Sequence, residues 1–210
     1  AGPVACRRAL WGVGAGACVG CPAVAYPACD VGARRAVARP VVVDGLAALG
    51  PLTPSTTPKL VWLNSPGNPT GAVLPVEHLA KVVAWARRHG VVVASDECYA
   101  ELDWRQPDSR RPGPRHTTPS ILDPAVCGGS HEGLLAVYSL SKQSNLAGYR
   151  AAFVAGDPAL VAGLVEVRRH AGMMMPGPVQ AGLLYTSDAA DARPREKPVG
   201  AGNIKKKKET

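Results

Sequence analysis

The sequence predicts an α/β fold in which a mostly parallel central sheet is flanked by helices. Short, continuously apolar runs alternate with longer segments of helical periodicity, which is typical of strand–helix–strand units with right-handed crossovers. Runs that are apolar throughout favour strands covered on both faces. The five candidate strands are Val41–Asp44, Leu60–Asn64, Val91–Ser95, Leu134–Ser139 and Ala151–Gly156.

The clearest helix follows the second of these strands. Pro75 suits the first helical turn, and the apolar residues at positions 76, 79, 82, 83 and 86 share one face. Three basic residues at 87–89 occupy the last turn, and Gly90 can end the helix. A second helix is predicted to begin at Asp157 and Pro158, and a third within the stretch GMMMPGPVQAGLL.

Both ends of the chain lack this alternation. Residues 1–20 are rich in Ala, Gly and Cys without a clear period, so we expect a separate N-terminal segment there. Residues 185–210 are polar and end in four lysines and two further residues, which predicts a basic tail that is disordered or non-native. Residues 21–184 are predicted to form the folded domain.

Composition and charge argue against membrane and nucleic-acid partners. Apolar residues make up 46% of the chain, but no apolar run is long enough to cross a bilayer, and no signal peptide is recognisable. The net charge is +8, yet most of the excess lies in a Pro/Arg-rich stretch at 105–115 and in the tail, without aromatic residues for base stacking. We expect a cytoplasmic protein.

The six cysteines include one CxxC pair, Cys18 and Cys21. A second pair at zinc-site spacing is missing, so no metal site is predicted. The pair also lacks the strand-to-helix setting of a redox motif. Free thiols in a reducing compartment are therefore expected.

Polar residues that can carry chemistry follow the ends of several predicted strands. Asn68 lies in the loop SPGNPTG, Asp96 and Tyr99 in DECY, and Lys142 shortly after LLAVYS; Arg150 immediately precedes the last strand. Because ligands of open α/β sheets bind beyond the carboxyl ends of the strands, these segments are expected to meet.

Each of these residues has an ordinary explanation when taken singly. Asn68 is a common turn former, Asp96 could cap a helix, Tyr99 could pack in the core, and Lys142 and Arg150 could be solvated. Together they match the needs of pyridoxal phosphate. That cofactor requires an amine for a Schiff base, a carboxylate at its ring nitrogen, donors to its phenolic oxygen, and a cation with hydroxyls for its phosphate.

The ordered motifs SPGNPTG, SDECY and SLSKQSNLAGYR resemble those of the class I/II, fold-type I pyridoxal-phosphate aminotransferases. The resemblance covers roughly residues 26–184. The wording SLSKQSNLAGYRAAFVAGDP, with CGGSHEGLLAV before it and RRHAGMMMPGPVQ after it, is most similar to actinobacterial N-succinyldiaminopimelate aminotransferases of lysine and diaminopimelate biosynthesis. On this resemblance, residues 21–184 are a fragment of the large, cofactor-binding domain.

The resemblance assigns roles to single positions. Lys142 would be the catalytic Schiff-base lysine and would move the proton at the substrate Cα. Asp96 would pair with the ring nitrogen, and Tyr26 in AYP would stack on the ring. Asn68 and Tyr99 would donate to the phenolic oxygen.

The phosphate group would be bound by three further residues. These are Arg150, Ser139 and Ser141. A guanidinium offers paired donors of the geometry that a phosphate accepts.

The resemblance also implies parts that this chain does not show. Family members have an N-terminal segment with a phosphate loop and a partner-subunit tyrosine, and a small C-terminal domain whose arginine binds the substrate carboxylate. The expected activity is transamination between an amino acid and a 2-oxo acid, with N-succinyl-diaminopimelate and glutamate as substrates and a homodimer as the full-length protein. The fragment alone could be inactive.

Two alternatives stay open at this point. The first is a lyase or decarboxylase of the same fold, since the motifs do not fix which substrate bond is broken. The second is a non-catalytic basic binding module, which only the net charge and the lysine tail favour.

Overall fold

The computed structural model describes residues 15–49, 51–102, 118–143, 147–172 and 175–181. The chain divides into two compact units, Ala1–Met174 and Met175–Thr210. In the second unit residues 177–181 are helical, within the third predicted helix, and the Gln180 side chain donates to the Met175 carbonyl at 2.7 Å. The Pro/Arg-rich stretch 105–115 and the predicted tail 185–210 lie outside the described residues.

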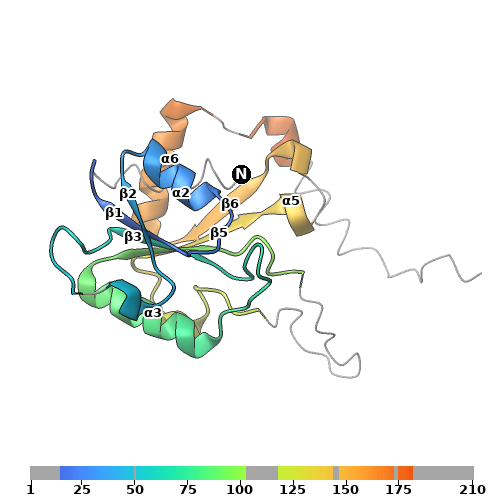
Figure 1. The fold of residues 1–210 in the computed structure, drawn as a ribbon. Helices are drawn as coiled ribbons and strands as arrows, with labels where there is room; N and C mark the ends of the chain where they lie inside the picture. The colour runs from blue at the N-terminus through green and yellow to red at the C-terminus, as the bar shows by residue number, and fades with distance from the viewer. Residues whose placement is uncertain (1–14, 50, 103–117, 144–146, 173–174, 182–210) are drawn as a thin grey trace, which may run out of the picture. The chain divides into compact units, whose positions relative to one another are not determined.

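A six-stranded sheet forms the centre of the first unit (Figure 1). Its strand order is β2-β1-β3-β4-β5-β6; the first five strands are mutually parallel, and β6 pairs antiparallel with β5. The strands are β1 (Cys18–Cys21), β2 (Arg39–Val42), β3 (Leu60–Asn64), β4 (Val92–Asp96), β5 (Leu134–Ser139) and β6 (Ala152–Gly156). The predicted fold class is confirmed.

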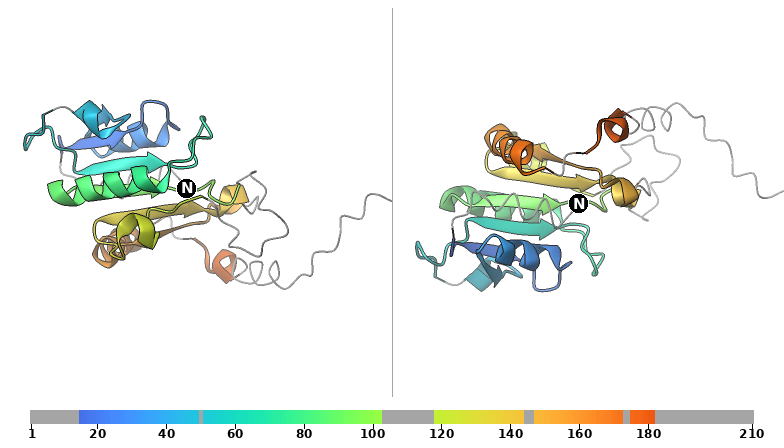
Figure 2. Two further views of the ribbon diagram at one scale, coloured as in Figure 1. Left: turned by 90° about the horizontal axis from the view of Figure 1, so that it is seen from below. Right: turned by 90° about the horizontal axis from the view of Figure 1, so that it is seen from above.

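Helices cover both faces of this sheet (Figures 1 and 2). Seen from below, α3 (Val76–His89) lies in front of the strands; seen from above, α2 (Ala28–Arg35) and α6 (Pro158–Ala171) do. The remaining short elements are η2 (Leu46–Leu49), α4 (Pro124–Cys127), α5 (Leu140–Gln143) and η3 (Ala147–Tyr149). Because the helices cover the two faces of the sheet, the carboxyl ends of the strands continue into loops at its edge.

Each face of the sheet packs in its own apolar cluster. Successive residues of a strand point alternately into one cluster and the other. In β3, Leu60 and Trp62 pack on the α2/α6 side, and Val61 packs on the α3 side. The same alternation places Ala94 of β4 with the first cluster and Val93 with the second. Burial on both faces explains why these strands are continuously apolar in sequence.

The ends of α3 and α6 follow from their sequences. Pro75 was predicted in the first helical turn, but it is the extended N-cap residue immediately before α3, which begins at Val76. Gly90 ends the helix at φ 63°. Asp157 caps α6 by accepting hydrogen bonds from the amides of Ala159 (2.8 Å) and Leu160 (3.3 Å). Among the described residues no helix is long and apolar enough to cross a membrane.

One cysteine prediction is wrong. Cys21 and Cys29 form a disulfide, whereas Cys18, Cys98 and Cys127 are free and buried; Cys6 lies outside the described residues. The disulfide partner of Cys21 is therefore not Cys18 of the CxxC pair, which lies in the same strand. The fold brings the end of β1 next to the start of α2, with 6.1 Å between the two Cα atoms, and spacing in the sequence does not reveal this.

Candidate active site

Three neighbouring parallel strands end in polar residues at the same edge of the sheet. Asn64 is the last residue of β3 and Asp96 the last of β4, and the two are partners in the strand register. Asp96 is also paired with Val137 of β5, so Ser139 ends β5 two residues further on. Parallel pairing therefore places an amide, a carboxylate and a hydroxyl side by side, at the edge where ligands of such sheets bind.

A cavity of about 250 Å³ opens at this edge, and all eight predicted site residues line it. Three further residues, Asn64, Cys98 and Ala147, complete the lining. The predicted residues in the lining are Tyr26, Asn68, Asp96, Tyr99, Ser139, Ser141, Lys142 and Arg150. The expected convergence of distant segments is observed, while the role of each residue toward a cofactor stays a prediction.

The Asn64 side chain connects the loop after β3 to the end of β4 at the cavity. Its Oδ1 accepts a hydrogen bond from the Asn68 amide at 2.7 Å, and its Nδ2 donates to the Asp96 carbonyl at 3.0 Å. Asn68 in turn donates from Nδ2 to the Tyr99 hydroxyl at 3.3 Å. The loop after β3 and the turn after β4 are thus tied together, and the amide and phenol predicted to share one oxygen acceptor are adjacent.

The Asp96 carboxylate lies next to Cys98. The Cys98 amide donates a hydrogen bond to Asp96 Oδ1 at 3.2 Å. Burial raises the pKa of the Cys98 thiol well above its usual range, the Asp96 charge raises it further, and the Lys142 charge lowers it. The thiol stays protonated at neutral pH, and both Asp96 and Lys142 are close enough to act on it.

Lys142 lies on α5, directly after β5, so its position follows from the end of a buried strand. Its Nζ is 5.5 Å from the centre of the Tyr99 ring, which is within the range of a cation–π contact. The amine of Lys142 and the phenol and carboxylate of the Asp96–Tyr99 turn line one cavity from two segments.

The serines and the arginine form a further group in the lining. The buried Ser139 accepts a hydrogen bond from the Ser141 amide on its Oγ at 3.3 Å. The Ser141 Oγ is buried and has no hydrogen-bond partner among the residues that the structure describes. Arg150 is exposed and donates from Nη1 to the Ala147 carbonyl at 3.1 Å.

This group fits an anionic ligand. A buried hydroxyl without a partner costs about 1–3 kcal/mol, and a phosphate oxygen that accepts from Ser141 would remove this cost. A guanidinium has five N–H donors, so Arg150 retains donors for such a ligand after its contact with Ala147. The residues present therefore fit the phosphate of the cofactor that the sequence motifs imply.

Comparison with known proteins identifies the family. The family described as "Aminotransferase class I and II" matches residues 22–197. The chain belongs to this family. Its members depend on pyridoxal phosphate, the cofactor whose chemical requirements the residues of the cavity match.

Two curated relatives show the extent of the match. The chain is 51% identical over 190 residues to the probable aminotransferase Rv1178 of Mycobacterium tuberculosis, covering 90% of this chain and 42% of the relative. It is 50% identical over 196 residues to the 4-dedimethylamino-4-oxo-anhydrotetracycline transaminase OxyQ of Streptomyces rimosus, covering 92% and 51%. The chain spans about half the length of the curated relatives it matches.

A solved structure agrees with this assignment. The probable N-succinyldiaminopimelate aminotransferase of Thermus thermophilus is similar with a TM-score of 0.74 and 26% identity, over 91% of this chain and 50% of the other. The aminotransferase fold is thus shared across the described sheet and its helices.

Sequence reasoning missed three lining residues. Asn64 is the last residue of a predicted strand, so the strand-end rule that selected Asp96 could have selected it too. Cys98 lies between Asp96 and Tyr99 in the same turn, and the cysteine pattern of the sequence predicts only a free thiol there. For Ala147 no signal in the sequence points to the cavity.

Proposed function

We propose that the protein containing this chain is a pyridoxal-phosphate-dependent aminotransferase, and that this chain supplies the covalent and ring-binding half of its active site. The observation that carries the proposal is the single cavity that gathers Lys142, Asp96, the Asn68–Tyr99 pair and the Ser139–Ser141–Arg150 group. When bound, pyridoxal phosphate supplies an aldehyde that accepts the amino group and a protonated ring that withdraws charge from the substrate Cα.

The residues of this chain hold that ring and move the proton. Lys142 Nζ is the amine that would bond the cofactor aldehyde in the resting site and, once the substrate amine has displaced it, would take the proton from the substrate Cα. The Asp96 carboxylate keeps the ring nitrogen protonated, because a nearby negative charge favours the charged form. Tyr26, which lines the cavity and is 54% exposed, would cover one face of the ring against water.

The remaining residues bind and orient the cofactor. Asn68 Nδ2 and the Tyr99 hydroxyl donate to the phenolic oxygen, and their 3.3 Å contact sets the spacing of the two donors. Ser139, Ser141 and Arg150 bind the phosphate, and charge-assisted hydrogen bonds of this kind are roughly twice as strong as neutral ones.

For the substrates we propose an amino acid and a 2-oxo acid, with N-succinyl-diaminopimelate and glutamate as the pair. The motif wording and the likeness to the Thermus thermophilus enzyme support this pair. The 50% identity to OxyQ, whose name gives a tetracycline intermediate, supports a larger ketone as the competing substrate. We further propose a homodimeric full-length protein in the cytoplasm, which the expected amino-acid metabolism favours.

Absorbance spectroscopy tests the proposal on the chain itself. Adding pyridoxal phosphate should produce the visible band of a Schiff base, which Lys142→Ala abolishes; Lys81→Ala, at an exposed position of α3, is the matched control. On the full-length protein, glutamate-dependent amino transfer should exceed pyruvate release or decarboxylation. A band that persists in Lys142→Ala would contradict the assignment, and dominant pyruvate release would indicate a lyase.

A further inference from the structure

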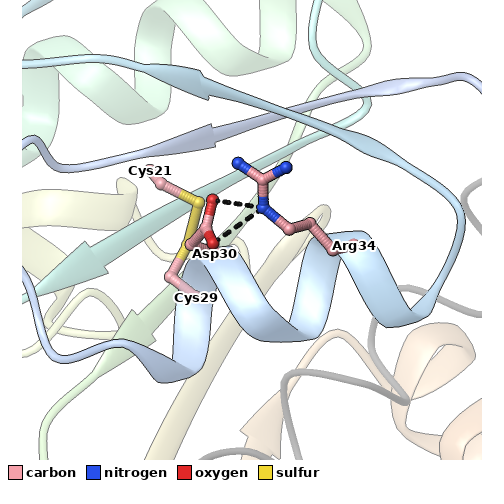
Figure 3. A network of polar contacts seen from close by, with 4 residues as sticks. All are labelled: Cys21, Cys29, Asp30 and Arg34. Atoms are coloured by element: carbon pink, nitrogen blue, oxygen red, sulfur yellow. Dashed lines mark hydrogen bonds and ion pairs between the residues drawn. A yellow bond between two sulfur atoms is a disulfide. The ribbon is translucent and has the colours of Figure 1, made fainter.

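The segment that carries Tyr26 is held at one point by a covalent bond. Cys21 ends β1 and Cys29 is the second residue of α2, and a disulfide joins them (Figure 3). Tyr26 lies in the short loop that this disulfide closes. Both cysteines are nearly inaccessible, at 5% and 7% exposure, whereas Tyr26 is 54% exposed. The tyrosine therefore reaches the cavity from a loop whose two ends are joined.

Without the disulfide, little else holds the start of α2. The helix has eight residues, and all four of its buried residues are small: Ala28, Cys29, Gly32 and Ala33. Small side chains bury little apolar surface, and a helix of this length is marginal alone. Pro27 at the N-cap makes no side-chain capping hydrogen bond.

The other polar contacts around the loop are weak substitutes for the covalent bond. Ala23 donates from its amide to Asp44 Oδ1 at 2.8 Å, at an exposed position. The ion pair between Arg34 and Asp30, at 2.9 Å beside the disulfide in Figure 3, is exposed and lies within the helix. Exposed ion pairs of this kind contribute little, and this one cannot fix the helix to the sheet.

We propose that the Cys21–Cys29 disulfide is a positioning device for Tyr26, and that its reduction by a dithiol weakens cofactor binding at the cavity. This inference rests on the proposed function, since it assigns regulation to the same site. Because both cysteines are buried, the dithiol reaches the sulfurs when the short helix α2 opens locally. The S–S bond then breaks and both sulfurs become thiols, while the dithiol gives up two electrons and two protons and becomes a disulfide itself.

Hydrogen exchange tests whether the disulfide holds the segment, and it needs no cofactor. The Ala23 amide bonds Asp44, and the Val31 amide bonds the Pro27 carbonyl at 3.0 Å, so both amides are protected. Reduction with dithiothreitol, with thiols counted by alkylation and mass spectrometry, should speed exchange at both at least about tenfold. Peptides from β4 and β5 serve as the internal control. Unchanged exchange with both thiols free would overturn the proposal.

Cofactor affinity tests whether the effect passes through Tyr26. Reduction should weaken pyridoxal-phosphate binding by roughly three- to tenfold in the wild-type chain and in Tyr26→Phe, but not in Tyr26→Ala. The double variant Cys21→Ala/Cys29→Ala should resemble the reduced chain and not respond to dithiothreitol. A loss of equal size in Tyr26→Ala would overturn the link to Tyr26.

The hydrogen-exchange and cofactor-affinity experiments distinguish a failure of this inference from a failure of the proposed function. If the oxidised chain forms no Schiff base at Lys142, the proposed function fails, and the exchange comparison alone decides whether the disulfide holds the segment. If the cofactor binds equally well before and after verified reduction, the proposed function stands and the positioning role is overturned.

Discussion

Ser141→Ala should have opposite effects on the cofactor-free and the cofactor-bound protein. The Ser141 Oγ is buried without a partner among the described residues, and its neighbour Ser139 already accepts from the Ser141 amide. Removing an unsatisfied hydroxyl relieves a cost of about 1–3 kcal/mol. Taking the low end, about 1 kcal/mol, the melting temperature of the cofactor-free chain should rise by roughly 2–4 °C.

The same substitution should weaken binding of the cofactor. A hydrogen bond to a charged phosphate contributes about 1.5–3 kcal/mol, so pyridoxal-phosphate affinity should fall by at least about tenfold. Affinity for pyridoxal, which lacks the phosphate, should be unchanged. Thermal unfolding without cofactor and absorbance titrations with both ligands measure these three quantities.

Ser139→Ala is the matched control from the same cavity. Its Oγ accepts a hydrogen bond at 3.3 Å, so its removal leaves the Ser141 amide without that partner and should lower the melting temperature. If Ser141→Ala also destabilises the cofactor-free chain, the hydroxyl has a partner after all. If it weakens pyridoxal and pyridoxal phosphate equally, Ser141 does not bind the phosphate, and the reasoning is refuted.

Three further predictions concern the ring nitrogen, the core and a helix cap. Asp96→Asn removes the charge that favours the pyridinium form, so the pKa of the bound ring nitrogen should fall by about 1–3 units in an absorbance titration; no shift would contradict the pairing. Leu79→Ala, at 1% exposure on α3, should cost about 2–5 kcal/mol in denaturant unfolding, and the exposed Lys81→Ala almost nothing. A hydrogen bond from the Gly133 amide lowers the pKa of Asp157, and hydrogen bonds from the amides of Ala159 and Leu160 lower it further. The stability that the Asp157 carboxylate contributes is therefore fully present above the ordinary Asp pKa and is lost as pH falls through the lowered pKa of Asp157. Asp157→Ala should cost about 0.5–2 kcal/mol at neutral pH, and that cost should shrink in acid; a constant cost would contradict the role of the charge.

Central strands were predictable because their burial on both faces leaves continuous apolar runs. The bounds of β3 and β5 agree with the prediction, and β4 is displaced by a single residue. The strand β1 escaped prediction because Gly20 interrupts it. A Cβ at that position would lie 3.0 Å from side-chain carbons of Val43 and Val61, so close packing requires glycine at a position where the strand pattern requires a larger residue.

The helix α2 and the disulfide were missed for a related reason. The buried face of α2 consists of small residues, so it lacks the large apolar residues that reveal helical periodicity. The pairing of Cys21 with Cys29 depends on where β1 ends and α2 begins, and only the fold brings these together. By contrast, the strand-end rule and the family motifs predicted the residues of the cavity, because parallel strands bring their carboxyl ends to one edge.

Borohydride reduction of the chain mixed with pyridoxal phosphate, followed by peptide mapping, tests most directly whether these segments enclose one cofactor. We expect a pyridoxyl group on Lys142 and none on the exposed Lys59 or Lys81. The same experiment with Asp96→Asn or Ser141→Ala should lower the occupancy at Lys142 at limiting cofactor. Label spread evenly over the surface lysines, with Lys142 unmodified, would contradict the account.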